Sequence, residues 1–224
     1  MFLVFGGENT AFQRFEYSEI KPIFAQKKTT MTSIAERPRP LTIEEYLEME
    51  ERSRSKHHFV KGQIVDMPGG TAKHNRIATN VAYAIEHQIR QKALPFIAIN
   101  SDMKVWIPAV ETFYYPDAVV ICEVLEYYPR RKDVILNPLL IVEVASPSTE
   151  DHDRSGKFLD YSTIPSFKEY LMVHQDQHYA RLSNRVESDL WQLSTVQGID
   201  QIIELKSIGC SISMRDIYFK TEDL

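Results

Sequence analysis

The sequence predicts a mixed α/β fold with a C-terminal antiparallel β-meander, and three observations lead to that prediction. Helix-like and strand-like segments alternate between residues 42 and 162. The run PLLIVEVAS, residues 138–146, is the most apolar segment and predicts a central strand. Short alternating segments then follow one another after residue 168. With 224 residues, 43% hydrophobic and 25% charged, the chain can build one domain with a substantial core.

The first thirty residues show neither clear periodicity nor strong helix caps. We therefore expect residues 1–30 to be a poorly ordered N-terminal extension, and residues 31–224, which open on a second methionine, to form the domain. The alternative is an ordinary N-terminal strand or arm. Thr42 with Glu45 three residues later predicts a capping box at the start of the first helix.

The following segments each predict one element. HHFVKGQIVDM (57–67) is typical of a hairpin that turns at Lys61-Gly62. Residues 69–92 place Ile77, Val81 and Ile85 at helical spacing and predict an amphipathic helix. Residues 95–108 and 113–122 predict two strands, and residues 153–162 a helix after the central strand. Four segments predict the meander and one a closing helix: EYLMVHQ, HYARLSN, DLWQLSTV and QIIELKS, then SMRDIYF.

Charge and cysteine content exclude some classes of protein. A formal net charge of −5 argues against a protein that simply coats nucleic acid, which would be basic. It is compatible with an enzyme that acts on nucleic acid, because carboxylates that bind a metal add negative charge. Cys122 and Cys210 fit no metal-ligand spacing and no disulfide framework. With no recognisable leader or membrane-spanning run, we expect a soluble cytoplasmic protein.

Two acids occur where strands should be buried. Asp117 opens the apolar strand DAVVIC, and Glu143 interrupts the central strand. A buried carboxylate costs several kcal/mol unless it is paired, hydrogen-bonded or bound to a metal. If the two strands are neighbours, these acids form an oxygen-rich pocket of the kind Mg²⁺ prefers. The alternative for each acid is a hydrogen-bonded group that only organises the core.

Asp153, Lys157 and Tyr161 follow at four-residue spacing, which places them on one helical face. Because only a short loop separates this helix from the Glu143 strand, Lys157 could lean over the proposed pocket. By spacing alone, the alternative is a surface ion pair that contributes a few tenths of a kcal/mol.

Several of these segments together resemble one family, the Uma-type endonucleases, a restriction-endonuclease-like branch of the PD-(D/E)XK nuclease superfamily. The resemblance runs from about Leu41 to Phe219 and is carried by YPDAVVI, LIVEVASPSTEDHDRSGKFLDY, SFKEYLMVHQDQ, HHFVKGQIVDMPGGTAKHNRIA and SDMKVWI. It implies a restriction-endonuclease-like mixed sheet flanked by helices. It also implies Mg²⁺-dependent hydrolysis of nucleic-acid phosphodiester bonds, with Mn²⁺ as an alternative ion, DNA as the expected partner and a homodimer as a common arrangement.

The resemblance also implies roles for individual residues. Asp117 and Glu143 would be metal ligands. The basic pattern has a lysine two positions after the glutamate, where this chain has Ala145. Lys157 would take over that role, because a cation near the attacking water or the phosphate offsets charge that develops in the transition state. Asp153 and Tyr161 would support it.

Other polar residues of the motifs have two readings each. Lys104 could assist catalysis, or be an exposed strand lysine. His74 could contact substrate or metal, or be a plain histidine at a helix start. Arg130, Arg131 and Lys132 could contact phosphates, or belong to a solvated loop.

One position departs from the family pattern. Relatives have an acid in the hairpin, in the pattern HE(F/Y)V(D/N)G, where this chain has His58 and then Lys61. Imidazole can ligate a metal but suits Mn²⁺ or Zn²⁺ better than Mg²⁺. The chain is therefore either an active nuclease with an altered metal preference or a catalytically degenerate nucleic-acid-binding protein of the same fold.

Overall fold

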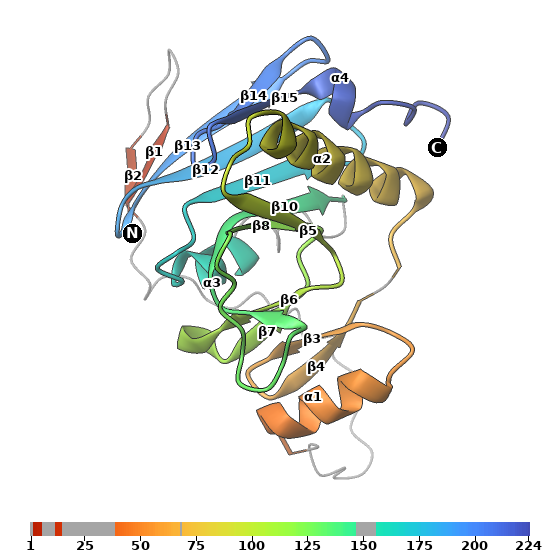
Figure 1. Cartoon of the computed structure of the whole chain (residues 1–224), viewed down its shortest axis with the longest axis vertical. Coiled ribbons are helices and arrows are strands. Elements are labelled where there is room, and N and C mark those ends of the chain that lie inside the picture. The colour runs from red at the N-terminus through yellow and green to blue at the C-terminus, as the bar shows by residue number, and fades with distance from the viewer. Residues whose placement is uncertain (1, 6–11, 15–38, 68, 147–155) are drawn as a thin grey trace, which may run out of the picture.

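In the computed structural model of the chain, residues 2–5, 12–14, 39–67, 69–146 and 156–224 are described. These residues form a large mixed sheet of eight strands in the order β2-β1-β13-β12-β11-β10-β8-β5 (Figure 1). Its strands are β1 (Phe2–Phe5), β2 (Phe12–Arg14), β5 (Phe96–Asn100), β8 (Ala118–Cys122), β10 (Pro138–Ala145), β11 (Glu169–His174), β12 (Tyr179–Glu187) and β13 (Leu190–Gln197).

The predicted central strand is β10, which pairs in parallel with β11 and antiparallel with β8. All its residues except Leu139 are buried, because both faces of the sheet are covered. Leu140, Val142 and Val144 pack on one face with the apolar stripe of α2 (Ala72–Gln91). Ile141 and Ala145 lie in a second core cluster with residues of α3 (Phe158–Ser162). By alternation along the strand, Glu143 points to the α3 face.

A second sheet of five strands, in the order β4-β3-β7-β6-β9, lies below the first in Figure 1 and carries α1 (Ile43–Arg52). This count, like that of the large sheet, refers to the described residues. Its strands are β3 (His57–Val60), β4 (Gln63–Asp66), β6 (Lys104–Ile107), β7 (Thr112–Tyr114) and β9 (Val134–Ile135), with a short 3-10 helix over Pro108–Val110 between β6 and β7. Aromatic residues of α1, β3, β6 and β7 fill the core between helix and sheet.

Local signals predicted several elements correctly. β3 and β4 form the expected hairpin, and the turn residues Lys61 and Gly62 both have positive φ. The Thr42 side chain accepts the Glu45 N–H, and the Glu45 side chain accepts the Thr42 N–H, so the capping box is confirmed. In the part of the chain that the structure describes, no helix has the length and apolar character needed to cross a bilayer.

The segment 113–122 does not form one strand. It divides into β7 and β8, which belong to different sheets, at Tyr115-Pro116-Asp117. The segment 95–108, also predicted as one strand, likewise divides into β5 and β6 of the two sheets. Pro116 has no N–H to donate to a ladder, and it sits at the point where the chain changes sheets. The break places Asp117 at the junction, one residue before β8.

The C-terminal strands also differ in part from the prediction. β11, β12 and β13 form the antiparallel meander, but β14 (Ile202–Leu205) leaves it and pairs with β15 (Cys210–Ser213). This two-stranded sheet and the closing helix α4 (Met214–Ile217) join α2 in the core cluster on one face of the large sheet. The closing helix is confirmed, whereas β15 and β9 were not predicted.

At the N-terminus, β1 pairs in parallel with β13 and antiparallel with β2. The other residues up to 38 lie outside the described part of the chain. The domain boundary at residue 31 therefore stays a prediction.

Candidate active site

Glu143 lies on β10, and Asp117 lies just before the neighbouring strand β8. The antiparallel register pairs Val119 with Ile141 and Ala118 with Val142. The next residues along the two segments are Asp117, just before β8, and Glu143 in β10. The Val144 N–H donates to Asp117 Oδ2 at 2.7 Å, which fixes the Asp117 carboxylate against β10. The pairing of β8 with β10 therefore brings the segments that carry the two acids side by side.

Lys157 and Tyr161 both contact the buried Glu143. Lys157 immediately precedes α3, and its Nζ lies 3.2 Å from Glu143 Oε1, with side-chain exposures of 9% and 4%. The Tyr161 hydroxyl donates to the same oxygen at 3.4 Å. The Lys157 ammonium also lies 5.9 Å from the centre of the Tyr114 ring, within the range of a cation–π contact. The third member of the predicted ladder, Asp153, lies outside the described residues.

His74 approaches the other carboxylate from the start of α2. Its Nε2 lies 3.4 Å from Asp117 Oδ2, and its backbone N–H donates to the N-cap hydroxyl of Thr71. Its Nδ1 is buried and finds no hydrogen-bond partner among the described residues. The ring packs against Gly70, where an added Cβ would come within 2.7 Å of Nδ1. A glycine at that position leaves room for the ring beside Asp117.

His58, which departs from the family pattern, packs against Tyr114 and Tyr115, where β7 ends. It lies on β3 and is buried, and its Nδ1 accepts the Tyr115 N–H at 3.4 Å. Its ring meets Tyr114 edge to face at a centroid distance of 5.1 Å. Within the described residues, no group of three or more His, Cys, Asp or Glu side chains could hold a metal ion, so His58 does not complete such a group with Asp117 and Glu143.

A buried network that was not predicted anchors the segment leading to Asp117. The Tyr115 hydroxyl donates to Glu50 Oε1 at 2.9 Å and accepts from Lys104 Nζ at 3.1 Å. Glu50 Oε2 lies 2.8 Å from His57 Nδ1. Glu50 shares the buried face of α1 with Tyr46, at four-residue spacing, which was the available sequence signal. The side chain and the backbone N–H of Tyr115 are thus both hydrogen-bonded, which fixes the chain two residues before Asp117.

The expectation that Lys104 is an exposed strand lysine is wrong. It is 4% exposed, because β6 lies between β7 and β9 inside the second sheet. Its Nζ forms a 2.6 Å ion pair with Asp133 Oδ2. Burial raises the pKa of the Asp133 carboxyl, but hydrogen bonds from Arg131 and Lys104 outweigh burial and hold it well below its usual range. These contacts give Lys104 a structural partner in the second sheet.

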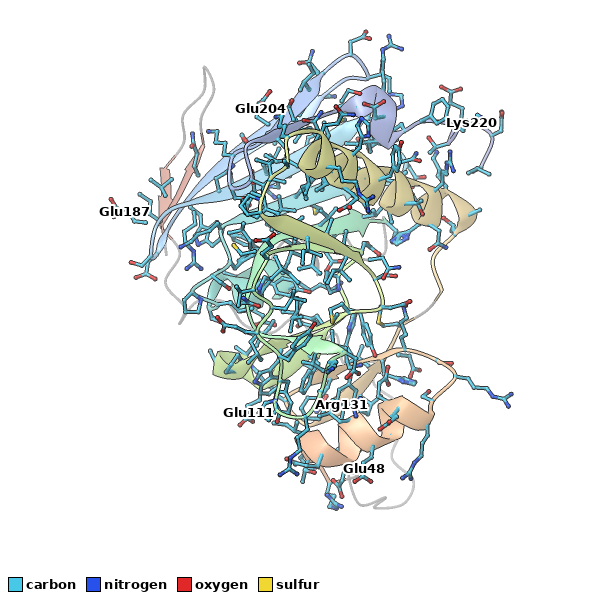
Figure 2. All side chains as sticks on the ribbon, viewed as in Figure 1. Glu48, Glu111, Arg131, Glu187, Glu204 and Lys220 are labelled. Carbon is cyan, nitrogen blue, oxygen red and sulfur yellow. The ribbon has the colours of Figure 1, made fainter. Side chains whose placement is uncertain are left out.

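The basic loop also serves the second sheet. Arg131 pairs with Glu51 at 3.2 Å and with Asp133 at 2.8 Å, and Figure 2 shows it close to α1. Arg130 has a φ of +63°, and Lys132 lies two residues further along the same connection. The contacts described for Arg131 tie it to α1 and to Asp133, so this side chain is held as part of the structure. A role of the loop in phosphate binding stays a prediction.

The donor set fits a hard divalent cation. Asp117 and Glu143 supply two carboxylates from adjacent segments, and Lys157 provides a compensating charge beside one of them. Mg²⁺ is commonly bound through one or two carboxylates and keeps several waters, which substrate phosphates can replace. Asp117 and Glu143, together with waters, could therefore hold such an ion.

Comparison with known proteins gives consistent results. A family model, Uma2, described as "Putative restriction endonuclease", matches residues 43–215. Two relatives come from Synechocystis sp. (strain ATCC 27184 / PCC 6803 / Kazusa), both described as uncharacterized. The protein sll1609 is 34% identical over 168 residues, covering 73% of this chain and 92% of the relative. The protein slr1290 is 36% identical over 181 residues, covering 80% and 91%.

A solved structure shows the same fold. It is the crystal structure of "a putative nuclease belonging to DUF820" from Anabaena variabilis ATCC 29413. It superposes with a TM-score of 0.64 and covers 80% of this chain and 98% of that chain. The sequence identity is 14%, so this comparison shows a shared fold and nothing more.

Proposed function

Because the chain belongs to the Uma2 family of restriction-endonuclease-like proteins, we propose that it hydrolyses phosphodiester bonds of DNA with a divalent metal ion. The observation that carries the proposal is that Asp117 accepts the N–H of Val144, the residue after Glu143, while the Lys157 ammonium lies 3.2 Å from the Glu143 carboxylate. This combines an oxygen-rich anchor for a cation with a fixed positive charge, both of which phosphoryl transfer requires.

Each side chain would have a distinct task. Asp117 and Glu143 would hold the ion, which is Mg²⁺ with Mn²⁺ as the alternative. When bound, such an ion polarises a phosphoryl oxygen and makes a water more acidic. Lys157 would place its charge where negative charge grows on the phosphate. Tyr161 fixes the orientation of Glu143, and His74 contacts Asp117, so both keep the carboxylates in position.

The test is cleavage of supercoiled plasmid with Mg²⁺, with Mn²⁺ and with EDTA, and an RNA of the same sequence tests the preference for DNA. We expect cleavage by the unmodified protein that requires the metal. Asp117→Asn and Glu143→Gln should each lower the rate by about 10²-fold or more. The matched control is Glu204→Gln, because Glu204 is exposed on β14, away from the proposed site (Figure 2). Full activity in Glu143→Gln would refute the proposed site.

One observation favours a second candidate, nucleic-acid binding without cleavage. His58 replaces the acid of the family's hairpin motif, and its Nδ1 is engaged by the Tyr115 N–H. If this replacement disables the chain, the unmodified protein binds DNA without cutting it, and His58→Glu gains metal-dependent cleavage. Cleavage by the unmodified protein at a rate that His58→Glu does not raise excludes this candidate.

A further inference from the structure

An open groove leads away from Asp117 between α2 and the edge strand β5. Its volume is about 620 Å³, within the range of sites that take small organic ligands. The Asp117 end is defined by the pairing of Asn100 with Ala118, the residue after Asp117. The groove is lined by Asn75, Ala78, Thr79, Ala82, Tyr83, Glu86, Ala98, Ile99, Asn100, Ser101 and Asp117.

The lining has the chemistry of a site for bases and sugars. The alanines at positions 78, 82 and 98 have small side chains, so a flat ring can come close to the backbone there. Neutral amides and hydroxyls line much of the rest, and the lining residues include no lysine or arginine. Phosphate binding normally relies on those cations, and Glu86 adds a negative charge that repels phosphate. The groove therefore favours the uncharged parts of a nucleotide.

Tyr83 provides an aromatic surface at the far part of the groove. It is 69% exposed, although burying an aromatic ring is favourable, and it stacks on His87 at 5.9 Å and 20°. Tyr83 lies eight residues after Asn75 on α2, about 12 Å along the helix axis. Stacked nucleotides advance about 3.4 Å per step along one strand. A strand with its phosphate at Asp117 would thus bring a base to Tyr83 within a few nucleotides.

A base can stack on Tyr83 only if it is not already stacked within a duplex. Proteins bind single strands by stacking bases on exposed aromatic side chains, at about 1–3 kcal/mol per base, and by a positively charged groove along the backbone. The lining of this groove offers the first of these contributions. We propose that this groove binds unpaired nucleotides next to the scissile phosphate, with one base stacked on Tyr83. The inference rests on the proposed function only for the position of that phosphate, and it specifies the substrate as single-stranded or locally opened DNA.

Binding without cleavage tests the groove separately from catalysis. In EDTA, fluorescence anisotropy would compare a labelled single strand of twelve nucleotides with the matched duplex, using the full chain. We expect tighter binding of the single strand, and Tyr83→Ala to weaken it by about 10-fold or more. Tyr83→Phe should retain the affinity, because the ring is kept. Tyr127→Ala is the matched control, since Tyr127 is also exposed and lies outside the groove lining.

Two results would refute the proposal that the groove binds unpaired nucleotides. One is equal or tighter binding of the duplex, and the other is an unchanged single-strand affinity in Tyr83→Ala. Absence of any single-strand binding by the unmodified protein would overturn it as well. Glu143→Gln separates the two proposals, because it removes a proposed metal ligand that is not among the groove-lining residues and leaves Tyr83 in place. If the unmodified protein binds single strands through Tyr83 but never cleaves, the proposed binding site is supported and the proposed nuclease activity is refuted.

Discussion

Replacing Lys157 with methionine removes the ammonium from Glu143 and keeps most of the aliphatic chain. Both side chains are at least nine-tenths buried, so the loss leaves a buried carboxylate without this counterion. Breaking a buried ion pair from one side costs about 3–5 kcal/mol. Because Tyr161 still donates to Glu143, we expect the lower end, about 3 kcal/mol. For a chain of this size that corresponds to a fall in Tm of about 6–12 °C.

The assay is urea unfolding in EDTA of the unmodified protein, Lys157→Met, Glu143→Gln and the double variant. The double variant carries no unpaired charge at this position, so its loss should be smaller than the sum of the two single losses. The expected coupling is at least about 1 kcal/mol, within the range for residues in contact. Strictly additive losses would show that the pair does not stabilise the fold, and the reasoning would fail. In a separate series with Mn²⁺ in place of EDTA, part of the stability of Lys157→Met should return, since a bound cation can neutralise Glu143.

Three further predictions concern the framework around the site. Tyr115→Phe removes a hydroxyl that bridges two buried charged groups and should cost about 2 kcal/mol in urea unfolding, whereas the exposed Tyr127→Phe should cost almost nothing; equal effects would contradict the network. Glu169, at the start of β11, accepts hydrogen bonds on both carboxylate oxygens from Lys206 and Ser207. Glu169→Gln replaces one of these oxygens with an NH₂ group and should cost about 1–3 kcal/mol relative to the control Glu204→Gln. The pKa of Asp133 is depressed, so its contribution to stability is present above the unfolded value of 3.8 and is lost as the pH falls below it. Asp133→Asn should therefore be less stable than the unmodified protein at pH 7 and should lose less stability on acidification; parallel pH curves would contradict this.

Elements with strong local signals could be predicted from the sequence. The long apolar run identified β10 as central, the Thr42–Glu45 spacing identified a helix start, and the Lys61-Gly62 turn identified a hairpin. Glu143 stood out for the same reason, since a carboxylate in such a run needs a partner. Its contact with Lys157 could be anticipated because the sequence predicts a helix carrying Lys157 soon after the strand.

Features that depend on long-range pairing could not be predicted. Nothing local shows that Pro116 separates two sheets, because a proline near a strand start is equally compatible with one strand. Lys104 is buried because a two-residue strand, β9, pairs beside it. Glu50 meets Tyr115 across 65 positions of sequence, and only the folded sheet brings them together. The surroundings of the site were thus less predictable than its charged residues.

Anomalous diffraction from crystals soaked in Mn²⁺ tests most directly whether Asp117 and Glu143 form a metal site. We predict an anomalous peak with oxygen atoms of both carboxylates within about 2.0–2.4 Å, the coordination distance for ions of this kind. The peak should be absent from the double variant Asp117→Asn, Glu143→Gln under the same conditions. A peak elsewhere that persists in the double variant, with none between these two carboxylates, would contradict the account.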